Sequence, residues 1–287
     1  MTEYDPIDPP VALTIAGSDS GGGAGVQADL SAMRAHGVFG TAVVTATTAQ
    51  NTRGVEDVHP LPADHVASQY AAVADDFDVA AVKTGMLATA ETVARVTTLV
   101  ADAEVPLVVD PVMVAATGDR LLSPDAEDAY EDLIAAATLV TPNADEAAVL
   151  TGEPVETPAD AEAAGRELVA LGADAALVKG GHLDGDSVDG ESADGDVVVD
   201  TLVRGAGAGG GASGPAVDRF ETPRIDTDAT HGSGCALSSA IAARLARGEA
   251  LRGAVGVAVE EMTEAVRCGY DVGEGPGAVN PTVLGGE

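Results

Sequence analysis

The sequence predicts an α/β fold, a three-layer sandwich in which helices cover both faces of a mostly parallel sheet. Two observations predict it: short apolar runs alternate with helix-like stretches, and these runs lack the polar alternation of half-exposed strands. The 287 residues are 46% hydrophobic, enough for a large core, and contain no internal repeat. We therefore expect residues 1–287 to form a single domain.

The expected strands are six apolar runs, at residues 11–16, 42–47, 80–83, 107–110, 139–141 and 175–179. Helix-like stretches at residues 24–36, 90–102 and 159–171 lie between runs, which indicates βαβ units. Two alanine-rich stretches, residues 233–247 and 251–268, are expected to be the last helices. Ligands bind beyond the carboxyl ends of parallel strands, so the polar residues after these runs mark the predicted site.

The segment of about residues 184–216 breaks the pattern, and we expect a mobile, acidic and glycine-rich surface excursion with a strand-like run at 197–203. Within its low-complexity tract at 205–214, Gly205-x-Gly207-x-x-Gly210 formally matches a dinucleotide-binding fingerprint. Such a site needs a strand-to-helix turn, and no helix signal follows here. A dinucleotide-dependent oxidoreductase is therefore a distant alternative.

The charge is strongly negative, with 47 acidic and 14 basic residues and a formal net charge of −33. This charge repels nucleic-acid phosphates and anionic lipid surfaces, so we expect no nucleic-acid partner and no membrane contact. No apolar run is long enough to span a bilayer, which predicts a cytoplasmic protein. Acidity on an apolar-rich, folded chain is typical of a halophilic protein, whose fold we expect to weaken in dilute buffer.

Lysine and cysteine are rare. Only Lys83 and Lys179 are lysine among the basic residues, and both end strand-like runs, so a role that arginine cannot fill is favoured over chance retention. Cys235 and Cys268 make no disulfide framework.

The loop at residues 16–25 joins the first strand to a helix, and its glycines permit close approach of backbone to a ligand. It fits a substrate-binding loop and a tight turn equally well. Asp29, one turn into the helix, is placed either to reach back to a polar ligand group or to be solvated.

The most informative segment ends in Gly232, Ser233, Gly234 and Cys235 at the start of an apolar helix. Their N–H groups and the helix dipole are expected to converge on negative charge such as a transferring phosphoryl group. A helix N-terminus lowers a thiol pKa, so we expect Cys235 to accept a proton near neutrality; the alternative is a small buried residue. His231 is interpreted as a turn residue or phosphate-side contact rather than a catalyst.

Two further strand ends carry polar groups suited to a metal and a nucleotide. Asp110 ends one apolar run, and Asn143 and Glu146 follow the next. Mg²⁺ needs only one or two carboxylates besides phosphate oxygens. Glu146 equally fits a helix cap with Asn143.

Seven motifs occur together, in order, over nearly the whole chain: LTIAGSD with GGAGVQAD (13–19, 22–29), TAQNT (48–52), KTGML (83–87), DPVM (110–113), TPN (141–143), KGGH (179–182) and THGSGC (230–235). With them the sequence resembles the hydroxymethylpyrimidine/phosphomethylpyrimidine kinases of thiamine biosynthesis, within the ribokinase-like superfamily. The resemblance implies ATP- and Mg²⁺-dependent phosphorylation of 4-amino-5-hydroxymethyl-2-methylpyrimidine and then of its monophosphate to the diphosphate. It also implies a homodimer. Some relatives continue into a thiamine-phosphate synthase domain; since this chain ends at Glu287, kinase activity alone is expected.

The resemblance also implies roles for individual residues. Gln50 would bind the pyrimidine edge, in a pocket lined by Gly17, Asp29, Thr48, Met86 and Val112. Lys179 and the amides of 232–235 would neutralise the phosphoryl charge, and Cys235 would be the base. The nucleotide would contact Asn143, Lys179, Thr230 and Gly232, and Mg²⁺ would be held through Asp110 and Glu146.

The chain departs from the family's pattern in three ways: Ser20 replaces a common proline, the tract at 205–214 lengthens a hairpin, and the surface is more acidic. The main alternative is a pyridoxal or pyridoxine kinase of the same superfamily, because both pockets accept a flat heteroaromatic alcohol. A non-catalytic ligand-binding regulator is a third alternative, which the intact Lys179 and Cys235 disfavour.

Overall fold

A computed structural model describes residues 6–101, 103–113, 129–181, 197–208 and 214–286. In chain order the strands and helices are β1 (Val11–Ser18), α1 (Gly25–Ala35), β2 (Phe39–Asn51), β3 (Gly54–Pro60), α2 (Ala63–Ala74), β4 (Val79–Thr84), α3 (Ala90–Val100), β5 (Leu107–Val109), α4 (Tyr130–Ala135), β6 (Leu139–Val140), α5 (Ala144–Thr151), α6 (Pro158–Ala170), β7 (Ala175–Val178), β8 (Val197–Arg204), β9 (Ala216–Pro223), α7 (Ser233–Ala246) and α8 (Leu251–Arg267). A short 3₁₀ helix, Pro281–Val283, follows.

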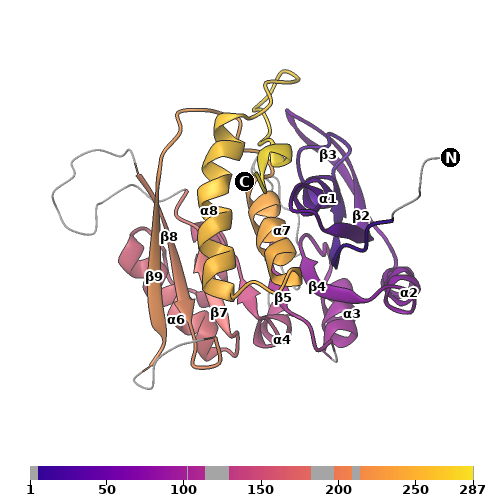
Figure 1. Cartoon of the computed structure of the whole chain (residues 1–287), viewed down its shortest axis with the longest axis horizontal. Helices are drawn as coiled ribbons and strands as arrows, with labels where there is room; N and C mark the ends of the chain where they lie inside the picture. Colours follow the sequence, from indigo (N-terminus) through magenta and orange to yellow (C-terminus); the bar gives the residue numbers. More distant parts are fainter. Residues whose placement is uncertain (1–5, 102, 114–128, 182–196, 209–213, 287) are drawn as a thin grey trace.

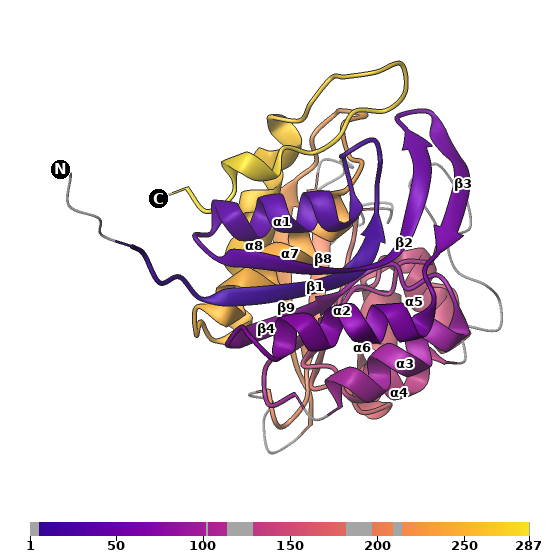
Figure 2. The same ribbon diagram turned by 90° about the vertical axis from the view of Figure 1, so that its right-hand side faces the viewer.

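The described strands form one nine-stranded sheet in the order β3-β2-β1-β4-β5-β6-β7-β8-β9. Strands β2, β1, β4, β5, β6 and β7, in this order across the sheet, pair in parallel. Strands β3, β8 and β9 are antiparallel to the strands beside them. Figure 2 shows α1, α7 and α8 on one face of the sheet and α2 to α6 on the other. The predicted three-layer α/β class is therefore confirmed.

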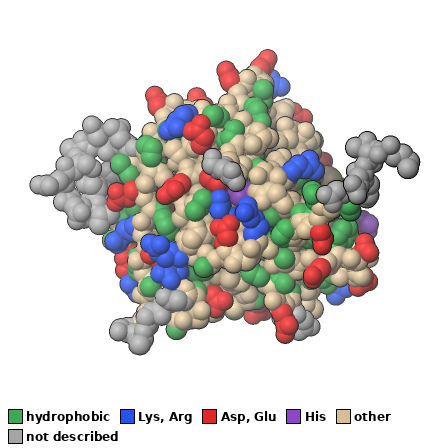
Figure 3. Space-filling model, viewed as in Figure 1, with side chains coloured by type: hydrophobic (Ala, Val, Ile, Leu, Met, Phe, Trp, Pro, Cys, Tyr) green, Lys and Arg blue, Asp and Glu red, His purple; other side chains and the backbone are tan. Residues whose placement is uncertain are grey.

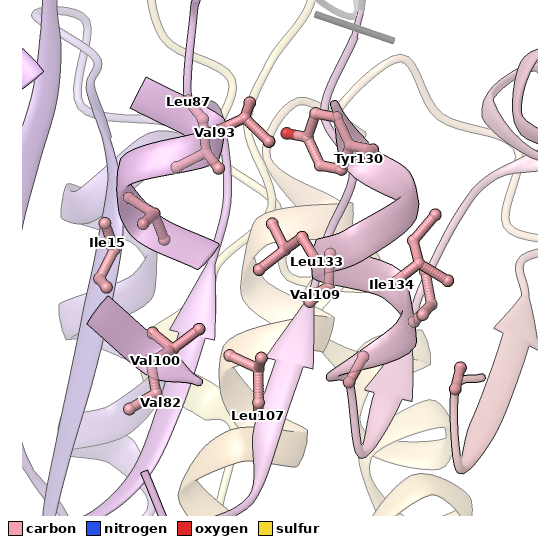
Figure 4. Close-up of a cluster of buried hydrophobic side chains, with 14 of the residues drawn as sticks. Ile15, Val82, Leu87, Val93, Val100, Leu107, Val109, Tyr130, Leu133 and Ile134 are labelled. Carbon is pink, nitrogen blue, oxygen red and sulfur yellow. The ribbon is translucent and has the colours of Figure 1, made fainter. Parts of the chain in front are cut away.

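A separate core fills the space on each side of the sheet. Beneath α3 and α4, strand residues such as Ile15, Val82 and Val109 pack against Val93 and Leu133 (Figure 4). On the opposite face, the alanine-rich sides of α7 and α8 pack on the sheet through small residues and Ile241. Alanines permit this close approach, which brings the start of α7 near the strand ends.

The six predicted strands are confirmed, with ends that differ by a few residues, and the predicted helices at 24–36, 159–171, 233–247 and 251–268 correspond to α1, α6, α7 and α8. The helix expected at 90–102 is α3, which ends at Val100; residue 102 lies outside the described part. Sequence patterns did not locate β3, α2, α4, α5 or β9. Strand β3 is half-exposed and polar at the sheet edge, so it lacks an apolar run.

Part of the expected surface excursion belongs to the sheet. Strand β8 runs between β7 and β9, with Thr201, Leu202 and Val203 buried. Residues 182–196 and 209–213, including half of the low-complexity tract, lie outside the described residues. The next element that the structure describes after Gly207 is strand β9, whereas a dinucleotide site would need a helix there.

Among the described residues, no helix has both the length and the apolar character that crossing a bilayer requires. On the face that carries α7 and α8, acidic and basic side chains lie beside one another (Figure 3).

Candidate active site

A cleft of about 830 Å³ lies beyond the carboxyl ends of the parallel strands, where the strand-end rule predicts it. Every predicted site residue except Asp29 lines it: Gly17, Thr48, Gln50, Met86, Asp110, Val112, Asn143, Glu146, Lys179, Thr230, Gly232, Ser233, Gly234 and Cys235. A smaller hollow of about 220 Å³ between α2 and the sheet is lined by residues such as Leu13, Tyr70 and Phe77, with no charged side chain, so chemistry belongs to the large cleft.

At one end of the cleft, β2 presents Thr48 and Gln50. The Thr48 hydroxyl lies 3.0 Å from the Ser18 carbonyl oxygen and 3.2 Å from Gln50 Oε1. Gly17 faces Met86, and a Cβ at Gly17 would lie 2.7 Å from the Met86 methyl carbon. A side chain at Gly17 would therefore displace the Met86 thioether from this part of the cleft.

The prediction that Asp29 lines the substrate pocket is wrong. Its side chain is fully buried and accepts hydrogen bonds from Thr14 Oγ1 (2.6 Å), Ser239 Oγ (2.8 Å) and Lys83 Nζ (2.9 Å). Lys83 is also fully buried. Burial lowers the pKa of Lys83, but the charges of Asp29 and Asp110 and the hydrogen bond to Asp29 outweigh it and hold the pKa well above the usual range. Lys83 is therefore a buried, charged residue beneath the cleft, where it cannot contact a phosphoryl group.

The helix start at 232–235 has the predicted shape with one difference. Gly232 caps α7 with φ of +79°, packed against the Gly23 carbonyl, a position that only glycine fills without strain. The Ser233 N–H donates to the Thr230 carbonyl (3.1 Å), so it does not point at a ligand. Gly234 and Cys235 belong to the first turn of α7, where backbone N–H groups have no intrahelical partner and suit an anion.

The Cys235 thiol is not acidified. Burial, the largest influence, raises its pKa to about 11; Lys83 lowers it, Asp29 and Asp110 raise it, and an N–H group from Gly25 lowers it. The expectation of a lowered thiol pKa is therefore wrong, because desolvation of the thiolate outweighs the helix start and the nearby lysine. In this environment the group is a thiol at neutral pH.

Two buried carboxylates and Lys179 form the other half of the site. Lys179 Nζ lies 3.0 Å from Asp110 Oδ1 and 3.9 Å from Glu146 Oε2. Asp110 also accepts from Thr141 (3.2 Å) and Ser238 (3.3 Å). Burial raises the pKa of Asp110, but the charges of Lys179 and Lys83 outweigh it and leave the pKa below its usual range.

Glu146 is the helix-cap residue that one of its two predicted roles describes, and its role toward Mg²⁺ stays a prediction. It forms a capping box with Asn143, in which each side chain accepts from the other residue's N–H at 2.8 Å, and it also lines the cleft. Burial raises the pKa of Glu146 to about 7, Lys179 lowers it and Asp110 raises it. The two carboxylates therefore carry more negative charge than one lysine balances at neutral pH.

Three features of the cleft were not predicted from the sequence: Asp200, the wall formed by α8, and the contact between Asp19 and His231. Asp200 interrupts the apolar run of β8 and accepts from the Gly180 N–H at 2.7 Å, and a single acid in such a run was the available signal. Helix α8 contributes an apolar wall at helical spacing, Val259, Met262 and Val266. Asp19 and His231, 3.0 Å apart, join two loops distant in sequence. His182, in the KGGH motif, lies outside the described residues.

Comparisons with known proteins agree with this geometry. A family model described as phosphomethylpyrimidine kinase matches residues 19–280. A hydroxymethylpyrimidine/phosphomethylpyrimidine kinase of Streptomyces coelicolor is 45% identical over 276 residues, covering 96% of this chain and 95% of that protein. A Bacillus subtilis pyridoxal kinase in complex with ADP superposes with a TM-score of 0.83 at 31% identity, covering 96% and 99% of the two chains. A phosphomethylpyrimidine kinase from Clostridium difficile has a TM-score of 0.72 at 38% identity, covering 89% and 99%.

Proposed function

The chain belongs to the phosphomethylpyrimidine kinase family, and on that basis we propose that it uses ATP to phosphorylate 4-amino-5-hydroxymethyl-2-methylpyrimidine and then its monophosphate, in the cytoplasmic synthesis of thiamine. One observation carries the proposal: a single cleft joins Gln50, able to bind an aromatic amide-like edge, to a glycine-flanked helix start beside Lys179. Acceptor and phosphoryl donor can thus meet within one site.

In this proposal the pyrimidine packs against the cleft wall formed by Gly17, Met86 and Val112. A flat ring fits against the Met86 thioether, and Gln50 supplies one donor and one acceptor in a plane. Thr48 orients that amide through its 3.2 Å contact with Gln50 Oε1. Hydrogen bonds of this kind set the choice among flat alcohols.

The transferring phosphoryl group would lie over the first turn of α7. The N–H groups of Gly234 and Cys235 and the Lys179 ammonium would stabilise its negative charge, while Asn143 and Thr230 line the nucleotide part of the cleft. Lys179 is held by Asp110 and is only slightly exposed, so its position is fixed before substrate binds. Positioning and electrostatics thereby provide the catalysis.

Cys235 is proposed to remove the proton from the substrate hydroxyl. A thiolate with a pKa of about 11 is a strong base that is scarce at neutral pH. Activity through this group therefore depends steeply on pH.

Asp110 and Glu146 fit a bound Mg²⁺. Both are buried carboxylates, the hard oxygen ligands that this ion prefers, and burial together with the charge of Asp110 raises the pKa of Glu146 to about 7. No cluster of three metal-ligating side chains occurs in the described residues, which suits an ion completed by phosphate oxygens and water. When bound, Mg²⁺ would neutralise phosphate charge.

Pyridoxal is the second candidate acceptor, because the described fold superposes well on pyridoxal kinases. Phosphoryl transfer from ATP and Mg²⁺ in molar KCl should be measured with the hydroxymethylpyrimidine, its monophosphate and pyridoxal in separate reactions. Diphosphate identified by mass from the pyrimidine supports both proposed steps. Turnover of pyridoxal alone would refute the proposed substrate.

We also propose that the protein is a homodimer, as the resemblance implies. Strand β3 is the edge of the sheet beside the substrate end of the cleft, and an edge strand is a natural pairing surface. Light scattering on the purified protein at several concentrations tests this, and a constant mass near 28.3 kDa would refute it.

A further inference from the structure

The first glycine loop, residues 17–25, makes contacts on two sides that the phosphoryl chemistry does not explain. On one side it touches the β2–β3 hairpin, which carries Gln50. On the other it touches residues 230–235, the anion loop. It therefore stands between the acceptor pocket and the phosphoryl site.

Ser20 holds the backbone of Gln50 from both directions. Its hydroxyl donates to the Gln50 carbonyl (2.7 Å) and accepts from the Gln50 N–H (2.8 Å). The register between β2 and β3 shifts between Ala49 and Gln50, so the ladder is irregular at this residue. One serine hydroxyl thus fixes the backbone from which the substrate-selecting side chain projects.

Asp19 holds the opposite side. Its carboxylate accepts from the N–H groups of Gly21 (2.7 Å), Ala24 (2.9 Å) and Gly23 (3.1 Å), and pairs with His231 Nε2 at 3.0 Å. Burial raises the pKa of Asp19, but the hydrogen bonds from His231, Gly21 and Ala24 outweigh it and leave the pKa below its usual range.

The anion loop also packs on the first glycine loop beside the contact between Asp19 and His231. A Cβ at Gly23 would lie 2.5 Å from the His231 ring, and Gly232 packs directly on the Gly23 carbonyl. Displacing His231 would therefore move Gly232, and with it the start of α7.

We propose that Ser20 and His231 are positioning residues, with Ser20 setting Gln50 in the acceptor pocket and His231, through Asp19, setting the amides of the anion loop. The first glycine loop then contacts both sites and fixes the position of the acceptor relative to the phosphoryl group. This inference rests on the proposed function, which supplies the two ligands.

The first test is Ser20→Ala, with Ser68→Ala as its matched control. Ser68 is exposed on α2 and donates to the Asp64 carbonyl, away from the cleft. Losing the Ser20 contacts should raise the pyrimidine KM about fivefold while the KM for ATP stays constant. An unchanged pyrimidine KM, or equal changes for both substrates, would refute the role of Ser20.

The second test compares His231→Leu with His231→Gln, and His65→Leu on exposed α2 is the control. Glutamine can still donate to Asp19, whereas leucine cannot. We expect His231→Leu to lower kcat about tenfold or more and His231→Gln to retain most of it. If both variants lose kcat equally, or neither does, the role of His231 as a positioning residue fails.

A third measurement needs no substrate, so it separates failure of this inference from failure of the proposed function. Amide hydrogen exchange should quicken at residues 49–51 in Ser20→Ala and at residues 232–235 in His231→Leu, with the rest of the protein unaffected. Localised exchange without pyrimidine turnover would leave the positioning role standing and overturn the substrate assignment. Unchanged exchange in both variants would overturn the inference itself.

Discussion

The pH dependence of phosphoryl transfer should reveal whether Cys235 is the base. With a thiol pKa of about 11, about one protein molecule in a thousand carries the thiolate at pH 8 and one in a hundred at pH 9. If the thiolate removes the substrate proton, the rate of the chemical step rises about tenfold per pH unit over this range. Cys235→Ser cannot supply that base, because a serine hydroxyl does not ionise there.

The assay is single-turnover rapid quench with saturating pyrimidine and ATP, which isolates chemistry from product release. We expect Cys235→Ser to bind both substrates normally, to lose about 100-fold or more of the rate, and to show no rise with pH. Cys268→Ser is the matched control, because Cys268 is exposed and its thiol contacts Glu264 at 3.1 Å, outside the cleft. A wild-type rate that is flat between pH 7.5 and 9.5, or full activity in Cys235→Ser, would refute the assignment.

Three further predictions concern stability. Asp29→Asn and Lys83→Met each leave a buried charge without its partner. Each should lower the free energy of unfolding, measured in denaturant titrations, by about 3–5 kcal/mol. A raised pyrimidine KM for Asp29→Asn at unchanged stability would instead return Asp29 to the substrate pocket. Burial raises the pKa of Asp200 to about 6, above its value in the unfolded chain, so this group favours the folded state at low pH and loses that contribution as pH rises toward 6. Asp200→Asn, whose amide oxygen can still accept from Gly180, should therefore raise the free energy of unfolding by roughly 2–3 kcal/mol at pH 7.5 and hardly at pH 4, and equal effects at both pH values would count against this. Finally, the net charge of −33 predicts that Tm in calorimetry rises between about 0.1 and 1 M KCl, as the screening length falls from about 10 to 3 Å; a constant Tm would contradict the halophilic prediction.

Local sequence features were sufficient for the central parallel strands and for most of the residues that line the cleft. Apolar runs such as those of β1, β4 and β7 must be buried on both faces, and this requires a parallel sheet covered by helices. Once the strands are parallel, the residues after them meet at one edge, which is why Asp110, Glu146 and Lys179 converge although Asp110 and Lys179 are 69 positions apart. Glycine loops before helices similarly indicated an anion site at Gly232 without any knowledge of packing.

Only the tertiary structure decided which polar groups face the cleft and which lie beneath it. Asp29 and Lys83 are 54 positions apart, and each looks free to serve a ligand until α1 and α7 pack over β1 and β4 and bury both. The same packing desolvates Cys235 and raises its pKa to about 11, where the helix start alone predicted a lower value. Desolvation depends on every neighbour in space. The sequence therefore shows which groups can ionise, but not how much free energy their surroundings add to the charged form.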